Sequence, residues 1–344
     1  MSAQQMPAIP PSPVHIFNTV QAYQRTFALK AAVDIDLFTA IAKGSRTAAE
    51  IAKSCNASER GVRILSDALV VMGFLTKSGN HYSLTPDAAF FLDSRSPAYM
   101  GLAFSFMLHP IQRTSFEHLG AAVRKGGPSE EHNTLAPDDP IWLEFAKGMA
   151  PLMVPAAQAI AGLLAGELSS RPSAKILDIA ASHGLFGITV AQRLPNAHIY
   201  ALDWANVLEV TKENAAKHGL ANRYHLLPGS AFDVDYGTGF DAILITNLLH
   251  HFDPSENEKM LKKAHAALNP GGQVIILEFV PNDDRVSPPV PAMFSLTMLA
   301  NTPKGNAYTL AEYATMCRNA GLEAPRLIPL EPMPQSLVVA RKAF

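Results

Sequence analysis

Residues 174–203 read AKILDIAASHGLFGITVAQRLPNAHIYALD, and this stretch decides the fold of the chain. An apolar run over 176–179 contains Asp178 and is followed by a turn of small residues, AASHG, over 180–184. A helical pattern comes next, and a second apolar run ends at Asp203. Strand, tight turn, helix and strand in this order form a βαβ unit, which predicts a parallel sheet.

The same unit predicts a site for a nucleoside. Small residues let the backbone of the turn approach a ligand, and a carboxylate at the end of the second strand can accept both hydroxyl groups of a ribose. The turn has neither the GxGxxG pattern of a dinucleotide site nor the lysine of a P-loop, so phosphate binding is not predicted. An adenosine without phosphates fits better, and S-adenosylmethionine (SAM) is the candidate ligand.

The rest of the chain after residue 174 alternates strands with helices, which predicts a mostly parallel sheet covered by helices on both faces. A helix is expected over 309–321, ending at a glycine. Residues 100–165 read as helices rich in aromatic and methionine side chains, interrupted by an exposed loop over 125–140. The seven expected strands are 176–179, 199–202, 224–227, 240–246, 273–279, 327–329 and 336–340, the last two at one edge.

The N-terminal part has the order of a winged helix. A helical pattern over 15–42 is followed by two short helices that begin at Thr47 and Ser58, and by a β-hairpin over 75–84. Residues 33–93 contain six Lys and Arg but seven Asp and Glu, whereas a DNA-binding module needs excess positive charge. We therefore favour a structural or dimerisation role over DNA binding.

The composition restricts the class of protein. A length of 344 residues favours two domains, here 1–100 and 101–344, and 48% hydrophobic residues predict a sizeable core. A net charge of −2 gives no electrostatic reason to expect nucleic acid or an anionic membrane as partner. The proline-rich residues 1–13 are expected to be disordered or draped over a neighbour, and they lack a signal-peptide pattern. No apolar stretch approaching the 18 residues of a membrane-spanning helix is recognised in the sequence. Two distant cysteines, Cys55 and Cys317, favour a reduced, cytoplasmic setting.

Two titratable residues follow neighbouring strands of the predicted sheet. His250 comes after the strand 240–246, and Glu278 lies near the end of the strand 273–279. Because adjacent parallel strands end at the same edge, we expect the two side chains to meet there, and a histidine oriented by a carboxylate is a general base. A structural hydrogen bond is the alternative. A metal site made of His250, His251 and Asp253 is disfavoured, because neighbouring residues point in different directions.

The chain resembles the SAM-dependent small-molecule O-methyltransferases of the plant caffeate and hydroxyindole type, which also occur in bacterial natural-product pathways. The resemblance covers nearly the whole chain, and the motifs that carry it are LDIAASHG, ALD, GSAFD, NLLHHFD, LNPGG before ILEF, and GNAYTLAEY. The resemblance implies a Rossmann-like class I methyltransferase domain with a seven-stranded sheet, an N-terminal winged-helix dimerisation domain, a homodimer and SAM as cofactor. It also implies that His250 deprotonates the acceptor hydroxyl and that Glu278 supports it.

The same resemblance implies the other site residues. Asp203 matches the ribose carboxylate, the adenine-flanking pair falls on Ser230 and Ala231, and Trp204 can pack on the adenine ring next to Phe232. Further cofactor contacts are expected at Asp178, Ala180, Ser182, Gly184 and Thr246. No metal is expected. An apolar acceptor pocket is expected from Met107, Trp142, Phe145, Met149, Met153, Met293, Phe294 and Met298.

Several positions depart from the family pattern. Ala180 and Ser182 stand where glycines are common, and they can replace glycine if φ is negative there. Ser230 takes the place of an acidic residue that often contacts adenine, and Ala307 takes that of a second catalytic glutamate of the plant enzymes. His251 replaces the aspartate that usually follows the histidine.

We expect the chain to transfer the methyl group of SAM to an oxygen of a phenol-like, natural-product-like acceptor, with His250 as base. One alternative keeps the fold and SAM but catalyses hydroxylation, decarboxylation or rearrangement. Another is a transcriptional regulator that senses a ligand, which the acidic winged helix disfavours. The sequence does not identify the acceptor.

Overall fold

The computed structural model describes residues 11–129 and 140–344, so the N-terminal ten residues and most of the expected loop over 125–140 lie outside the described part. The chain folds as two compact units, residues 1–104 and 105–344. We call them the N-terminal unit and the C-terminal unit. The division lies close to the boundary expected at residue 100 and separates the winged helix from the sheet.

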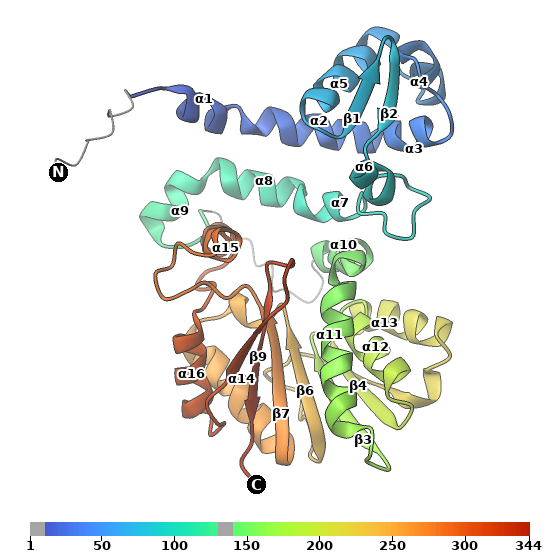
Figure 1. Cartoon of the computed structure of the whole chain (residues 1–344). Helices are drawn as coiled ribbons and strands as arrows, with labels where there is room; N and C mark the ends of the chain where they lie inside the picture. The colour runs from blue at the N-terminus through green and yellow to red at the C-terminus, as the bar shows by residue number, and fades with distance from the viewer. Residues whose placement is uncertain (1–10, 130–139) are drawn as a thin grey trace, which may run out of the picture. The chain divides into compact units, whose positions relative to one another are not determined.

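The N-terminal unit has the winged-helix order that the sequence predicts. The two expected helix caps are formed, because the Thr47 hydroxyl accepts a hydrogen bond from the Glu50 N–H at 3.3 Å and the Ser58 hydroxyl from that of Gly61 at 3.0 Å. The elements are α1 (Val14–Val20), α2 (Ala22–Asp34), α3 (Leu37–Ala42), α4 (Ala48–Ser54), α5 (Glu59–Val71), β1 (Leu75–Ser78), β2 (His81–Leu84) and α6 (Pro86–Phe91) (Figure 1).

The expected helix over 15–42 is divided into three, and Asp36, between α2 and α3, has a left-handed backbone with φ of 56°. Leu37, Phe38, Ile51 and Leu69 form a fully buried core beneath the hairpin residue Tyr82. In contrast, α1 and the first half of α2 carry exposed apolar side chains: Val14, Ile16, Phe17, Val20, Tyr23 and Phe27. We call this set of six side chains the apolar row. It exposes more apolar surface than a monomeric protein ordinarily leaves in water.

The C-terminal unit contains a seven-stranded sheet in the order β5-β4-β3-β6-β7-β9-β8. Strands β3 to β7 are parallel, and β9 and β8 add an antiparallel edge, as the sequence predicts. β7 begins before the expected residue 273, because the LNPGG segment is itself extended and Leu268 pairs with Phe240. The strands are β3 (Ala174–Ile179), β4 (Ala197–Asp203), β5 (Tyr224–Pro228), β6 (Phe240–Thr246), β7 (Leu268–Glu278), β8 (Arg326–Pro329) and β9 (Ser336–Arg341).

Helices cover both faces of this sheet (Figure 1). Alternate residues of a strand point to opposite faces, so Ile176 packs with α11 and α12, while Leu177 packs with α14 and α16. β6 is buried at every position, as expected of a central parallel strand. The helices of this region are α7 (Ala103–Met107), α8 (Pro110–Glu117), α9 (Leu119–Lys125), α10 (Pro140–Gly148), α11 (Ala150–Leu168), α12 (Leu185–Arg193), α13 (Ala205–Lys217), α14 (Pro254–Ala267), α15 (Pro289–Asn301) and α16 (Leu310–Asn319).

Helix α11 corrects one expectation from the sequence. It is 19 residues long and, by length and composition alone, apolar enough to cross a membrane, although no stretch of that kind was recognised. In the structure one side of α11 lies in the core against α12 and β3. Its buried residues are Met153, Ala156, Ala157, Ile160, Ala161, Leu164 and Leu168. α11 therefore has the packing of a core helix.

Candidate active site

The parallel strands β3 to β7 end along one side of the sheet, which we call the carboxyl edge. Ligands of open α/β sheets bind at this edge, because the loops there diverge and leave room. It comprises the turn 180–184 after β3, Asp203 at the end of β4, the loop 229–234 after β5, the segment 247–251 after β6, and Glu278 at the end of β7. These segments hold the candidate cofactor and catalytic residues.

The turn 180–184 has the left-handed backbone typical of glycine, although Gly184 is its one glycine. Ala180 has φ of 58°, Ser182 of 51° and Gly184 of 75°, all in the left-handed region. The condition under which alanine and serine could readily replace glycine here, a negative φ, is therefore not met. A left-handed conformation costs a residue with a Cβ atom about 1–2 kcal/mol, so the surrounding structure must hold the turn in place.

Side chains from α13 and β5 hold the carbonyl groups of this turn. Thr211 donates to the carbonyl of Ser182 at 2.5 Å, Asn214 to that of His183 at 3.0 Å, and Tyr224 to that of Gly184 at 3.0 Å. The backbone N–H of Ala181 donates to the Leu202 carbonyl at 3.1 Å, which ties the turn to β4. Residues of three elements thus over-determine the conformation that Ala180 and Ser182 would not adopt alone.

Asp203 lies at the end of β4, directly beside the turn. Its Oδ2 accepts the N–H of Ser182 at 2.8 Å, and its Oδ1 accepts the N–H of Trp204 at 2.7 Å. Each carboxylate oxygen can accept a second hydrogen bond, so two acceptor positions remain for a pair of hydroxyl donors. Burial raises the pKa of Asp203 to about 6. This geometry suits the two hydroxyl groups of a ribose.

Two buried polar atoms near the turn lack a partner among the described residues, namely Asp178 Oδ1 and Ser182 Oγ. The other oxygen of Asp178 accepts the N–H of Gly187 at 3.1 Å. Burial raises the pKa of Asp178 to about 7. Unpartnered buried polar atoms are rare in proteins, and here they fit a ligand that brings hydrogen-bond donors, as the amino group of SAM does.

The loop after β5 was expected to flank an adenine ring. The Ser230 hydroxyl accepts the N–H of Phe232 at 3.1 Å and so closes the loop locally. Lys263 of α14 donates to the carbonyl groups of Ala231 at 3.0 Å, Phe232 at 2.6 Å and Val234 at 2.9 Å. No pattern in the sequence pointed to Lys263, because it lies about 30 positions away, on α14.

His250 and Glu278 meet at the carboxyl edge. His250 belongs to a single turn of 3-10 helix, Leu249–His251, and its Nδ1 lies 2.6 Å from Glu278 Oε2. Its backbone N–H also donates to Glu278 Oε1 at 3.3 Å. Both side chains are buried. Because the carboxylate accepts from Nδ1, the lone pair of His250 is on Nε2, which is the arrangement of a general base.

His251 lies against His250, with their Nε2 atoms 3.1 Å apart. Its Nδ1 is buried and has no partner within the described ranges. Burial, and then the charge of His250, lower the pKa of His251 well below its usual value, so the ring is neutral. Asp253 faces elsewhere, because it caps α14 and pairs with Lys304 at 2.9 Å. Across residues 11–129 and 140–344, no group of three or more His, Cys, Asp or Glu could hold a metal ion.

The segment 305–309 packs directly on the backbone of the histidine turn. The N–H of Asn306 donates to the His250 carbonyl at 2.9 Å. A Cβ atom at Gly305 would lie 2.2 Å from the same carbonyl oxygen, so only glycine fits. Ala307, in the place of the second glutamate of the plant enzymes, is buried and supplies no carboxylate. Glu278 is thus the carboxylate that contacts His250.

Aromatic side chains surround the two histidines. Phe294 packs edge-on against His250, with ring centroids 4.9 Å apart, and stacks on Phe279 at 4.0 Å. Trp142 packs edge-on against His251 at 5.4 Å, and Phe145 lies 6.1 Å from Trp142. Phe145 also stacks on His183 at 6.4 Å, an imidazole whose pKa burial lowers to about 4. The sequence did not single out His183 as a site residue.

The remaining expected site residues differ in how deeply they are buried. The sulfur of Met153 accepts a hydrogen bond from Asn247 at 3.5 Å, at the point where β6 ends in a left-handed residue. The sequence did not single out Asn247 either, although asparagine after a strand is a signal for this conformation. Thr246 and Met298 are buried, and Trp204 and Met149 are half-buried. Met107 and Met293 are 55% and 63% exposed.

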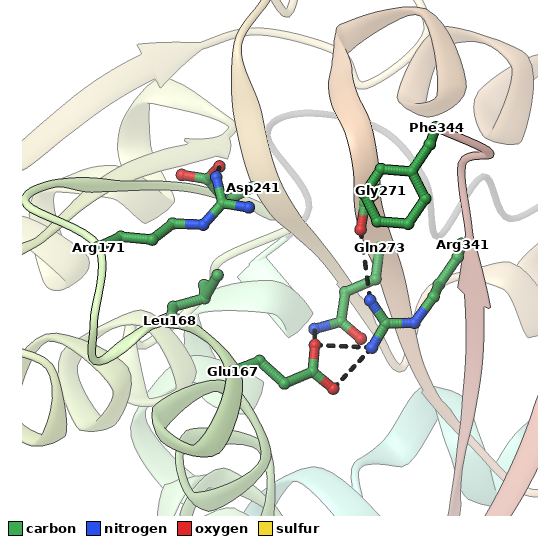
Figure 2. Close-up of a pocket in the computed structure, with 8 residues that line it drawn as sticks. All are labelled: Glu167, Leu168, Arg171, Asp241, Gly271, Gln273, Arg341 and Phe344. Atoms are coloured by element: carbon green, nitrogen blue, oxygen red, sulfur yellow. Dashed lines mark hydrogen bonds and ion pairs between the residues drawn. The ribbon is translucent and has the colours of Figure 1, made fainter.

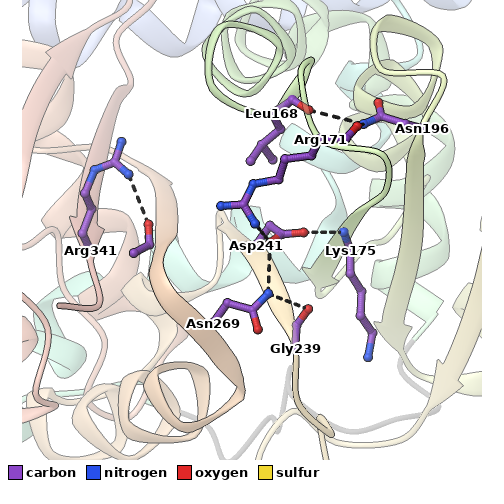
Figure 3. A network of polar contacts seen from close by, with 9 residues as sticks. Leu168, Arg171, Lys175, Asn196, Gly239, Asp241, Asn269 and Arg341 are labelled. Atoms are coloured by element: carbon purple, nitrogen blue, oxygen red, sulfur yellow. Dashed lines mark hydrogen bonds and ion pairs between the residues drawn. The ribbon is translucent and has the colours of Figure 1, made fainter. Parts of the chain in front are cut away.

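A polar pocket of about 360 Å³ lies at the opposite side of the sheet, where β6 and β7 begin, and we call this side the amino edge. Glu167 accepts hydrogen bonds from Arg341 at 2.7 Å and from Gln273 at 2.9 Å (Figure 2). Asp241 accepts from Arg171 at 2.6 Å, from the Lys175 N–H at 2.9 Å and from Asn269 at 3.0 Å (Figure 3). Phe344 and Gly271 complete the pocket with Leu168. Its carboxylates are thus paired within the chain.

Comparison with known proteins gives a consistent result. The O-methyltransferase domain family matches residues 116–323, and the O-methyltransferase dimerisation domain family matches residues 17–94. A 3-hydroxy-5-methyl-1-naphthoate 3-O-methyltransferase from Streptomyces sahachiroi is 28% identical over 309 residues, which is 88% of each chain.

Solved structures agree with the sequence relatives. A candidate O-methyltransferase from Nostoc punctiforme is 50% identical, with a TM-score of 0.92 over 97% of this chain and 100% of that chain. Human N-acetylserotonin methyltransferase in complex with SAM shares the fold at 20% identity, with a TM-score of 0.84 over 98% and 100% of the two chains. The chain described here belongs to the O-methyltransferase family in which an O-methyltransferase dimerisation domain precedes the catalytic domain.

Proposed function

We propose that this enzyme transfers the methyl group of SAM to a phenolic hydroxyl group of an aromatic, natural-product-like small molecule. The observation that carries the proposal is the 2.6 Å contact between His250 and Glu278, buried among aromatic rings at the carboxyl edge. A phenol is a weak nucleophile until it loses its proton, so a buried histidine–carboxylate pair supplies what this acceptor needs. The naphthoate methyltransferase relative supports an aromatic acceptor.

The cofactor would be held by the turn and the strand ends. The carboxylate of Asp203 would accept the ribose hydroxyl groups, and Asp178 Oδ1 and Ser182 Oγ would accept from the amino group of the methionine portion. The loop that carries Ser230 and Phe232 would border the adenine, in the position that Lys263 fixes. When bound, SAM supplies a methyl group activated by its sulfonium charge.

The protein residues contribute position and proton transfer. His250 accepts the proton of the acceptor hydroxyl, and Glu278 keeps the proton of His250 on Nδ1 and stabilises the imidazolium that forms. Phe294 and Trp142 border the histidines and restrict access of water to them. Holding the acceptor oxygen in line with the methyl group supplies a large part of the acceleration in such displacements.

We also propose that the enzyme works as a homodimer through its N-terminal unit. The apolar row on α1 and α2 is exposed, and the dimerisation domain family matches residues 17–94. Burying such a surface against a second copy removes apolar area from water, at about 25 cal/mol per Å². Sedimentation equilibrium should give the mass of two chains at micromolar concentration, and a single-chain mass would contradict the proposal.

The proposed reaction is tested by incubating the protein with SAM that carries a deuterated methyl group and with hydroxynaphthoates and simple phenols. Mass spectrometry should show one labelled methyl group on oxygen in the product. The matching methyl ethers serve as controls, because they lack the hydroxyl proton and should not react. A product that is oxidised or decarboxylated without the label would contradict the proposal.

A further inference from the structure

The contact between His250 and His251 determines where the protons of both rings lie. Glu278 accepts from His250 Nδ1 at 2.6 Å, so a neutral His250 carries its proton on Nδ1 and its Nε2 is an acceptor. The Nε2 of His251 lies 3.1 Å from that acceptor. A hydrogen bond needs one donor and one acceptor, so His251 carries its proton on Nε2. Its Nδ1 is then the unprotonated nitrogen.

This assignment changes which lone pair can receive a proton from an acceptor. The lone pair of His250 is already occupied by the N–H of His251. The lone pair on His251 Nδ1 is buried and has no partner in the described part of the chain. Trp142 packs edge-on against the His251 ring, and Phe294 packs against His250, so both rings are fixed by neighbours. The nitrogen with an unused lone pair at the end of this chain of hydrogen bonds therefore belongs to His251, not to His250.

We propose that His251 relays the proton of the acceptor hydroxyl to His250, an inference that rests on the function proposed above. The acceptor O–H proton moves to Nδ1 of His251, while the proton on Nε2 of His251 moves to Nε2 of His250. His250 becomes an imidazolium paired with Glu278, and His251 remains neutral throughout. The phenolate oxygen forms the new bond to the methyl carbon, and the carbon–sulfur electron pair returns to the sulfur of SAM.

The relay leaves every hydrogen bond of the cluster satisfied after the transfer. The His250 Nδ1–H still donates to Glu278, and the new Nε2–H of His250 donates to the now unprotonated Nε2 of His251. Neutral His251 suits this role, because burial and the neighbouring His250 oppose a charge on its ring. The charge instead rests on His250, which contacts the carboxylate at 2.6 Å. An ionised aspartate in place of His251 would have no proton to donate to His250 Nε2.

The first test reads the tautomers without any acceptor. The protein is prepared with isotope-labelled histidine, and long-range proton–nitrogen correlation spectra at neutral pH report which ring nitrogen carries the proton. His250→Gln and His251→Gln assign the two signals, and His218→Gln, at an exposed histidine, serves as control. We expect Nδ1–H in His250 and Nε2–H in His251. The opposite tautomer in either ring would overturn the relay.

The second test compares turnover of one methylated phenol among variants of position 251. Glutamine can still donate to His250 Nε2 but cannot carry a proton, so His251→Gln should lower kcat by roughly 10²-fold or more. The dissociation constant of SAM should change little. Combining His251→Gln with His250→Gln should cost little more than either change alone, because relay members act as a unit.

Direct proton transfer to His250 predicts the reverse. If the proton moved directly to His250, proton transfer through the His251 ring would not be needed, so unchanged or faster turnover in His251→Gln would overturn the relay and leave the proposed function intact. Failure of the wild-type protein to methylate any phenol would instead refute the proposed function. In that case the tautomer spectra still decide whether the proton path exists.

Discussion

The two edges of the same sheet use buried polar side chains in opposite ways. At the amino edge, Asp241 accepts from three donors and Glu167 pairs with Arg341, so the carboxylates are satisfied within the chain. At the carboxyl edge, Asp178 Oδ1 and the Nδ1 of His251 are left without partners among the described residues. A satisfied network stabilises a fold, whereas atoms left open mark a place for a ligand.

The comparison also shows why a cavity alone does not assign a function. The pocket of about 360 Å³ lies at the amino edge, where Arg171 and Arg341 are already paired with carboxylates. The candidate catalytic residues lie at the other end of the same strands: in β7, Gln273 lines the pocket, and Glu278, five residues further along, contacts a histidine. One amide oxygen, Gln273 Oε1, is the exception at the amino edge, since it has no partner in the described ranges.

The largest effect on turnover is expected when His250 at the carboxyl edge is removed. His250→Ala removes the group that takes up the acceptor proton, so kcat should fall by roughly 10²–10⁴. SAM should bind with nearly unchanged affinity, because the cofactor contacts lie at Asp203 and the turn. Steady-state kinetics and isothermal calorimetry measure the two quantities. Turnover within threefold of wild type, about 0.65 kcal/mol, would exclude His250 as the base.

Replacing one aspartate by asparagine at each edge tests whether the two edges differ in function. Asp203→Asn removes the charge that would accept the ribose hydroxyl groups, so the affinity for SAM should fall by about tenfold to a hundredfold, as expected for bonds to a charged group. Its free energy of unfolding should change less than that of the amino-edge variant, because relief of the burial that raises the pKa of Asp203 to about 6 offsets the loss of one of its two bonds from the N–H groups of Ser182 and Trp204. Calorimetry and urea unfolding measure the two properties.

Asp241→Asn should show the reverse pattern. An amide at this position turns its NH₂ group either toward the Lys175 N–H or toward the Arg171 and Asn269 donors, so the free energy of unfolding should fall by about 1–3 kcal/mol. The affinity for SAM should stay at the wild-type value. If both variants lost affinity and stability to the same degree, the functional division between the two edges would be refuted.

The affinity for SAM should depend on pH through Asp203. The ribose hydroxyl groups donate to the ionised carboxylate, and burial places its pKa at about 6. Binding should therefore be strongest above pH 6 and weaken as the carboxylate takes up a proton, by about tenfold between pH 7 and pH 5. Calorimetry across this range should show the step, and Asp203→Asn should remove it. A step that survives in this variant would assign the titration to another group.

The smallest effect concerns the strained turn. Ala180→Gly relieves a left-handed alanine but adds freedom to the unfolded chain, so the free energy of unfolding should rise by about 0.5 kcal/mol. Ala181, which is buried and is not left-handed, is the matched control. Ala181→Gly should lower the free energy of unfolding by about 1 kcal/mol, because it removes a buried methyl group and increases the conformational freedom of the unfolded chain. Equal losses in both variants would show that φ at Ala180 carries no strain.

The sequence predicts the fold well, because its signals are local and periodic. Apolar runs locate the strands, the capping residues Thr47 and Ser58 locate helix starts, and Gly321 locates the end of α16. Strand order then brings His250 to Glu278, because residues that follow adjacent parallel strands share an edge. These conclusions need no knowledge of side-chain packing.

The features that the sequence did not predict depend on contacts between distant segments. The left-handed backbone at Ala180 and Ser182 is held by donors such as Thr211 and Asn214, which lie on α13, about 30 positions further along the chain. A residue in this conformation looks like any other alanine or serine in the sequence. Lys263 likewise acts on a loop about 30 positions away. The contact between His250 and His251 depends on ring rotation, which adjacency along the chain does not fix.

The close packing at Gly305 has a consequence for how this enzyme can change over generations. Any side chain there would collide with the carbonyl group of His250, so the position offers no neutral variants from which a new preference could begin. Ala307 is buried two residues further on, and a carboxylate introduced there would carry the cost of burying a charge. A laboratory selection for new acceptors is therefore expected to leave position 305 as glycine and to gather its substitutions among the aromatic neighbours of the histidines.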